Sequence, residues 1–147
     1  MILDKNWWFI GYVFGMNIGA SFYISRTIDN HCLLINETQE GFITSDHPII
    51  NVHQSLSSKT VRVPEENEAD FFYPISPKIA YMINKSDRFS KKINYVSLDF
   101  VKEMNKKMAE NANKYIVSDD CNLIDIYKKH VGSRMKIIQE HSVYSPL

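Results

Sequence analysis

Residues 71–83 read Phe-Phe-Tyr-Pro-Ile-Ser-Pro-Lys-Ile-Ala-Tyr-Met-Ile and carry the clearest structural signal in the chain. The apolar run at 71–75 predicts a strand, and its proline is typical of a sheet edge, where a strand does not need every backbone N–H. The run at 78–83 alternates in part between apolar and polar residues, which predicts a further strand. Ser76 and Pro77 between the two runs predict a rigid corner.

Short apolar runs before this stretch extend the predicted sheet. Residues 32–35 and 42–44 flank a polar turn that ends in Gly41, a pattern that predicts a β-hairpin. Residues 49–52 predict a strand that resumes after Pro48, and residues 60–63 predict at most one more.

The residues after the sheet have helical spacing. Ser97 is suited to cap a helix over 98–116. Asp119 or Asp120 is suited to cap a second helix. The two apolar stripes are Val101, Met104, Met108, Ala112 and Tyr115, then Ile124, Tyr127, Val131, Met135 and Ile138. Strands grouped before helices predict an α+β fold, with two C-terminal helices packed on an antiparallel sheet, in a single domain over 1–147.

The charge of the chain is balanced in total but not along its length. It has 17 Lys+Arg and 17 Asp+Glu among 147 residues, which argues against a uniformly basic nucleic-acid coat. Residues 1–77 hold four basic and nine acidic residues, and residues 78–147 hold thirteen and eight. Two interpretations stay open. The halves neutralise each other, within one fold or in a head-to-tail dimer, or they form a bipolar surface for an anionic partner.

The N-terminal region contains a long stretch without charge, at residues 7–25. Its length is close to that of a membrane span, and Gly11, Gly15 and Gly19 have the spacing of packed membrane helices. Its glycines and polar residues favour a buried core segment instead. We find no secretory signal, and Cys32 and Cys121 lie outside any CxxC pattern. We therefore expect a cytoplasmic protein with reduced cysteines.

The densest polar cluster is the stretch at 44–48, Thr-Ser-Asp-His-Pro. Ser45, Asp46 and His47 are candidate catalytic residues, because a carboxylate beside a histidine is able to serve general acid–base chemistry. The alternative is that these side chains bond nearby backbone groups and define a turn.

Candidate binding residues are spread over the corner and the helices. They are Ser76, Asn105, Lys128, Lys129 and Lys136. Asn105 adjoins the apolar stripe, so we expect it to satisfy a buried backbone group or to reach the turn at 44–48. The three lysines fall away from the second stripe and form either a solvated face or a basic docking surface. Histidines and cysteines show no metal-ligand spacing and no nucleotide motif is present, so we predict neither a metal nor a cofactor.

Three segments in order resemble one known family. They are residues 34–38 leading into Phe42-Ile43-Thr44-Ser45-Asp46-His47-Pro48, then Tyr73-Pro74-Ile75-Ser76-Pro77-Lys78, then residues 101–118 with Asn105 and Asn111. Over about residues 33–118 this pattern resembles the C-terminal part of the bacterial domain-of-unknown-function 4238 family. Members of that family usually have Asn where this chain has His47, and an N-terminal His-Tyr-Val-Pro-Gln region not found in these 147 residues. The resemblance implies an intracellular protein of bacterial or phage origin, and it implies no particular reaction.

Three functions follow as hypotheses. The first is a small module that binds another protein, a second copy of the chain included, in a regulatory or defence-related role. The second is a hydrolase or nuclease centred on Asp46, with Ser45, His47, Ser76 and Asn105 around it. The third is membrane association through residues 7–25. Nucleic-acid binding is not indicated, and whether the protein is an enzyme stays open.

Overall fold

The computed structural model describes residues 13, 15–17, 19–20, 24, 29–57, 59–65, 67–86 and 88–141. Five strands form one sheet in the order β3-β4-β5-β1-β6. The strands are β1 (Asn30–Ile35), β3 (Ile50–Asn51), β4 (Asp70–Ser76), β5 (Ile79–Asn84) and β6 (Ile93–Tyr95). All neighbours are antiparallel except β1 and β6, which run parallel. β2 (Thr44–Ser45) and β7 (Ile116–Val117) form a separate two-stranded ribbon.

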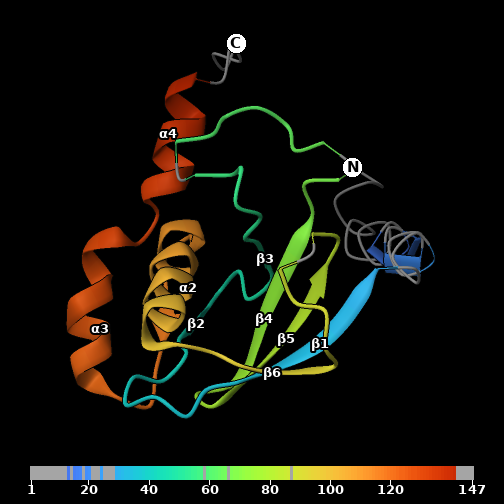
Figure 1. Ribbon diagram of the computed structural model, residues 1–147. Helices are drawn as coiled ribbons and strands as arrows, with labels where there is room; N and C mark the ends of the chain where they lie inside the picture. Colours follow the sequence, from blue (N-terminus) through green and yellow to red (C-terminus); the bar gives the residue numbers. More distant parts are fainter. Residues whose placement is uncertain are drawn as a thin grey trace.

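The helices cover one face of the sheet (Figure 1). α2 (Leu98–Asn111) lies against the strands, and α3 (Cys121–Tyr127) lies on the outer side of α2. A short 3₁₀ turn, η1 (Lys128–His130), leads into α4 (Ser133–His141). This arrangement confirms the predicted α+β class, with a mostly antiparallel sheet and C-terminal helices packed on it.

The core lies between the sheet and α2. In β4 and β5, Phe72 is opposite Met82, and both side chains are completely buried. They face the predicted stripe of α2, of which Val101, Met104 and Met108 are also completely buried. The ring of Phe72 makes edge-on contacts with two further aromatic rings, Phe42 at 5.3 Å and Phe100 at 6.4 Å between centroids.

The predicted hairpin at 32–44 is wrong. β1 pairs with β5 and β6, whereas Thr44 and Ser45 pair with β7. The polar turn after β1 is held at the corner between β4 and β5, because the Asn36 amide donates hydrogen bonds to the carbonyls of Glu40 and Pro77. The chain therefore folds against the β4–β5 corner before it reaches β2. Residues 60–63, predicted as a strand, lie in a loop.

The helices differ from the prediction at their ends. Ser97 caps α2 and Asp120 caps α3, as expected. α2 ends at Asn111, so Tyr115 lies beyond it and is 68% exposed. The predicted second helix is divided at Gly132, whose φ of 71° lies in the left-handed region that ends helices.

No helix among the described residues is long and apolar enough to cross a membrane. The stretch at 7–25 lies largely outside the described residues.

Candidate functional site

A groove lies between the end of β4 and the β2–β7 ribbon. Its volume is about 350 Å³, and we call it the β4–β7 groove. Its lining comes from three parts of the chain: Phe42 and Thr44; Pro74, Ile75, Ser76 and Pro77; Val117, Ser118 and Asp119. Two of these parts are the motif segments singled out in the sequence.

The groove forms where β4 continues beyond the end of its pairing with β3. β3 pairs with β4 only at Phe71 and Phe72. The Asp70 carbonyl accepts a 2.7 Å hydrogen bond from the Val52 N–H and therefore points away from β5. Backbone groups of every second residue in a strand point to the same side, so the carbonyl of Pro74 also points away from β5. Proline has no N–H to leave unpaired there, as expected for an edge position. The chain just after β2 is held beside β7, because the Asp46 N–H donates to the Tyr115 carbonyl at 3.1 Å.

The inner end of the groove depends on a close approach at Gly41. Beside it, the Phe42 N–H donates to the Pro77 carbonyl at 2.9 Å. A methyl group on Gly41 would lie 3.0 Å from Pro77 Cβ and 3.6 Å from Asp119 Oδ1. A larger residue at position 41 would therefore have to push the Pro77 ring away by a few tenths of an ångström.

The surface of the groove is largely apolar and partly open to solvent. Ile75 is 56% exposed and Val117 is 58% exposed. Asp119 supplies the one charged side chain of the lining, and Thr44, Ser76 and Ser118 supply hydroxyl groups. This lining suits an apolar side chain flanked by a hydrogen-bonding or basic group.

Asp46 lies beside the groove but is fully engaged with backbone groups. Its two carboxylate oxygens accept hydrogen bonds from the N–H groups of Asn113 at 2.9 Å and Lys114 at 2.8 Å. Although desolvation raises the pKa of the Asp46 carboxyl, these hydrogen bonds outweigh it and hold the pKa below its ordinary value. Asp46 thus joins the segment after α2 to β2.

The two other candidate catalytic residues also make local contacts. The Ser45 hydroxyl lies 3.0 Å from the His47 carbonyl and accepts from the His47 N–H at 3.1 Å. His47 Nδ1 lies 3.2 Å from the Asn111 carbonyl. These contacts are those of a turn that is docked on the end of α2.

Asn105 is buried between the groove and the core. Its Oδ1 accepts from the Ile43 N–H at 2.9 Å, and its Nδ2 donates to the Gly41 carbonyl at 2.8 Å. This confirms the expectation that Asn105 satisfies buried backbone groups. Its amide also donates to Glu40, whose carboxylate accepts a hydrogen bond from the Tyr127 hydroxyl. Burial and the Glu40 carboxylate raise the pKa of Tyr127.

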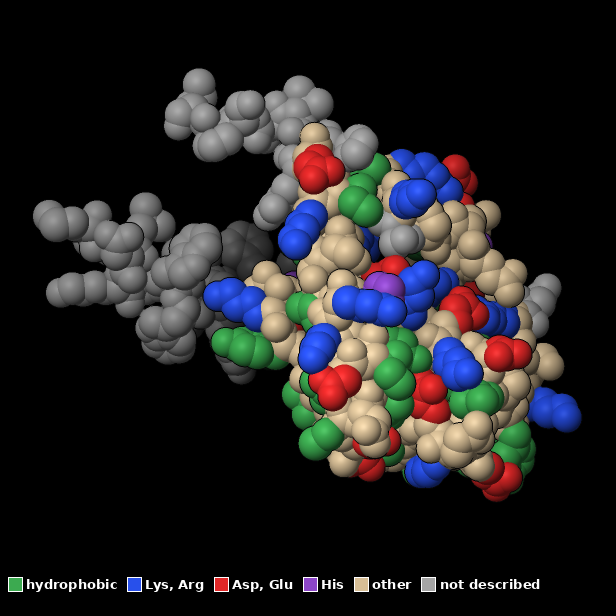
Figure 2. Space-filling model, turned by 90° about the vertical axis from the view of Figure 1, so that its left-hand side faces the viewer, with side chains coloured by type: hydrophobic (Ala, Val, Ile, Leu, Met, Phe, Trp, Pro, Cys, Tyr) green, Lys and Arg blue, Asp and Glu red, His purple; other side chains and the backbone are tan. Residues whose placement is uncertain are grey.

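Ser76 and the three candidate lysines do not form one site. Ser76 lines the groove, and its hydroxyl accepts from the Lys78 N–H at 3.3 Å. Lys128, Lys129 and Lys136 are exposed on η1 and α4, and none of them lines the groove. Lys128 pairs with Asp125 at 2.6 Å. Figure 2 shows Lys and Arg side chains interspersed with acidic ones on the face that carries these helices.

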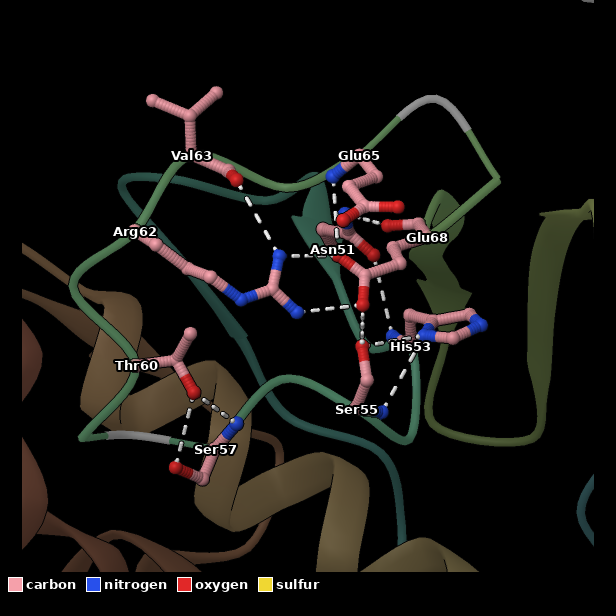
Figure 3. Close-up of polar contacts among 9 residues, drawn as sticks. All are labelled: Asn51, His53, Ser55, Ser57, Thr60, Arg62, Val63, Glu65 and Glu68. Atoms are coloured by element: carbon pink, nitrogen blue, oxygen red, sulfur yellow. Dashed lines mark hydrogen bonds and ion pairs between the residues drawn. The ribbon is translucent and has the colours of Figure 1, made fainter.

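The densest polar network lies in the loop between β3 and β4 (Figure 3). Glu68 accepts a two-pronged contact from the Arg62 guanidinium and hydrogen bonds from the Ser55 hydroxyl and the Glu65 N–H. His53 Nδ1 lies 2.9 Å from the Ser55 hydroxyl. The serine hydroxyl lies between histidine and glutamate and points at the carboxylate, so the order of groups differs from that of a catalytic triad. We interpret the network as a clamp that closes the loop.

This clamp gives a testable pH dependence. The Arg62 guanidinium, the Glu65 N–H and the Ser55 hydroxyl lower the pKa of Glu68 well below its usual 4.5. A carboxyl with a lowered pKa stabilises the folded loop above its unfolded pKa, and this contribution is lost as the pH falls through the folded pKa. We therefore expect the amide proton shift of Glu65 to stay constant from pH 7 to 4.5 in NMR spectra. Glu68→Gln should move that resonance at every pH, and a titration midpoint near 4.5 in the native protein would contradict the clamp.

The described residues contain no group of three or more His, Cys, Asp or Glu side chains arranged to hold a metal ion. Both cysteines are free, Cys121 at the surface and Cys32 in the core. Burial raises the pKa of the Cys32 thiol.

Several groove and network residues were missed in the sequence. Val117, Ser118 and Asp119 were assigned to a helix end or a helix cap and not to a site, and they reach the groove because Val117 pairs with Thr44, 73 residues earlier. Glu40 and Tyr127 also come together over a long separation. Gly41 had a local signal, since it ends a polar turn, but its contact with Pro77 depends on the tertiary fold.

Comparison with known proteins gives one match. A family model described as "Protein of unknown function (DUF4238)" matches residues 16–122. No significant match was found among curated proteins or among solved structures.

Proposed function

We propose that this chain, which belongs to the DUF4238 family, is a protein-binding module that uses the β4–β7 groove. The family model covers residues 16–122 and therefore every residue that lines the groove. The observation that carries the proposal is the open, apolar edge of β4 beside exposed Ile75 and Val117. Apolar groups exposed together in a concave surface commonly mark an interaction site.

The geometry supports a peptide segment as the bound form. The groove volume of about 350 Å³ matches one or two large side chains rather than a whole domain surface. Asp119 at one end favours a segment with Lys or Arg next to its apolar residue. In keeping with the sequence resemblance, we place this binding inside a bacterial or phage-infected cell, in a regulatory or defence-related role.

The alternative, a hydrolase or nuclease centred on Asp46, draws less support. A catalytic carboxylate needs a free oxygen directed at substrate or metal. Each Asp46 oxygen already accepts a backbone N–H of the segment after α2, which gives this carboxylate a structural role.

Selection of a phage-displayed random peptide library on the purified protein tests the proposal. We expect enrichment of peptides with one large apolar residue beside a basic one. Calorimetry should then show that Ile75→Glu weakens the selected peptide by about 30-fold or more, because the substitution places a carboxylate in an apolar contact next to Asp119.

Ile126→Glu is the matched control. Ile126 is 50% exposed on α3, close to the 56% of Ile75, and does not line the groove. This variant should bind the peptide as the native protein does. Equal binding by Ile75→Glu, or a library that yields no enriched sequence, would overturn the proposal.

A further inference from the structure

A second pocket lies at the opposite edge of the sheet, over β6 and the loop that precedes it. Its volume is about 360 Å³, and it shares no residue with the β4–β7 groove. Its lining combines cations, aromatic rings and polar groups: Arg88, Phe89, Ser90, Lys91, Ile93, Asn94 and Tyr95. The sequence analysis did not assign any role to this basic segment.

Arg88 is the most constrained residue of this pocket. Its side chain is only 16% exposed, and its guanidinium carbon lies 4.9 Å from the centre of the Phe100 ring. Nη2 donates to Glu103 at 3.0 Å, whereas Nη1 is buried and has no hydrogen-bond partner among the described residues. A buried donor of a charged group is costly when it is unpaired, so such a donor indicates a missing acceptor.

Among the described side chains, Glu103 is the acidic partner of Arg88. The same carboxylate also pairs with Lys107 at 3.1 Å. Lys91 adds a further cation in the pocket lining, and its carbonyl is fixed by a 2.8 Å hydrogen bond from the Asn94 amide. The described side chains around the pocket therefore favour an anion.

Two aromatic rings, those of Phe89 and Tyr95, also belong to the lining of the pocket. Tyr95 is 70% exposed, and Phe89 packs edge-on against Phe100 at 5.5 Å between ring centroids. An exposed aromatic ring offers a surface on which a planar ring stacks, and the two cations of the lining suit a phosphate attached to that ring.

We propose that this pocket binds a mononucleotide-sized ligand, with its phosphate on Arg88 and Lys91 and its planar ring on Tyr95. Arginine recognises phosphate through several donors at once, and a small turn of the Arg88 side chain toward the pocket would let the buried, unpaired Nη1 supply one of them. The Ser90 hydroxyl, also in the lining, provides a further donor. This site is independent of the groove, and so of the proposed peptide binding.

NMR titration of the isotopically labelled protein tests the site with five probes: a nucleoside 5′-monophosphate with a purine base, one with a pyrimidine base, the two matching nucleosides and inorganic phosphate. We expect the monophosphates to shift the amide resonances of residues 88–95 and to bind about tenfold more tightly than phosphate or nucleoside alone. Lys91→Glu and Tyr95→Ala should each weaken binding about tenfold. Both side chains are exposed, so these variants are expected to fold.

Lys59→Glu is the control, because it makes the same charge change on an exposed loop residue that does not line the pocket. It should bind as the native protein does. The inference is overturned if no monophosphate binds, if phosphate alone binds as tightly as the monophosphates, or if Lys91→Glu binds as well as Lys59→Glu.

Discussion

Asp70→Ala should lower the free energy of unfolding by about 3 kcal/mol. Asp70 is completely buried in β4, and its carboxylate accepts three hydrogen bonds. Oδ1 accepts from the N–H groups of Lys85 and Ser86, each at 3.1 Å, and Oδ2 accepts from the Ser86 hydroxyl at 2.6 Å. Alanine removes both acceptor oxygens, and with them all three hydrogen bonds, and leaves a cavity, so the turn after β5 loses its attachment to β4.

Asp70→Asn removes the negative charge of the side chain but keeps its ability to form hydrogen bonds. The amide keeps an oxygen for the two backbone donors, and the Ser86 hydroxyl is able to rotate and accept from the amide nitrogen. We expect a loss of about 1 kcal/mol for this variant in urea unfolding followed by circular dichroism. If Asp70→Asn destabilised the protein as much as Asp70→Ala, the negative charge itself, and not the hydrogen-bond geometry, would hold this turn.

Local signals in the sequence predicted those parts of the fold that short-range chemistry controls. The corner at Ser76 and Pro77, the cap at Ser97 and the buried stripe of α2 all follow from neighbouring residues. The hairpin at 32–44 failed because the Asn36 amide bonds the Pro77 carbonyl, 41 residues away. A break in the second helix was foreseeable, because Gly132 stands within its predicted span.

The groove could be predicted only in part. The segments at 42–48 and 73–78 were recognised as motifs, and both contribute to the lining. The third side depends on a ribbon of two strands with two residues each, which is too short for any periodicity to appear in the sequence.

Charged side chains of the two halves differ in the partners they find. The ion pairs Arg62–Glu68 and Arg88–Glu103 each join residues of the same half. Basic residues of the second half contact backbone carbonyls of the first instead, for example Lys107 with Val52 and Arg134 with Ser57.

Asn105→Asp should lower the free energy of unfolding by about 4 kcal/mol at pH 7. Asn105 is 1% exposed, and its amide nitrogen donates to the Gly41 carbonyl and to the Glu40 carboxylate. The substitution replaces this donor with a negatively charged oxygen that faces two acceptors. Asn105→Ala should cost about 3 kcal/mol, because it removes the same hydrogen bonds without adding a charge.

The difference between these two variants should depend on pH. Burial and the nearby Glu40 carboxylate raise the folded pKa of the new carboxyl above its unfolded value of about 3.9. Its penalty is therefore complete above the folded pKa and declines as the pH falls toward the unfolded pKa. Urea unfolding should show that the free energy of unfolding of Asn105→Asp is closer to that of Asn105→Ala at pH 5 than at pH 7. Asn113→Asp, at an exposed position, is the control, and its free energy of unfolding should change little. A gap that stays constant between pH 7 and pH 5 would mean that the new carboxylate finds a cation, and that Asn105 is not the donor which joins Glu40 and Gly41 to α2.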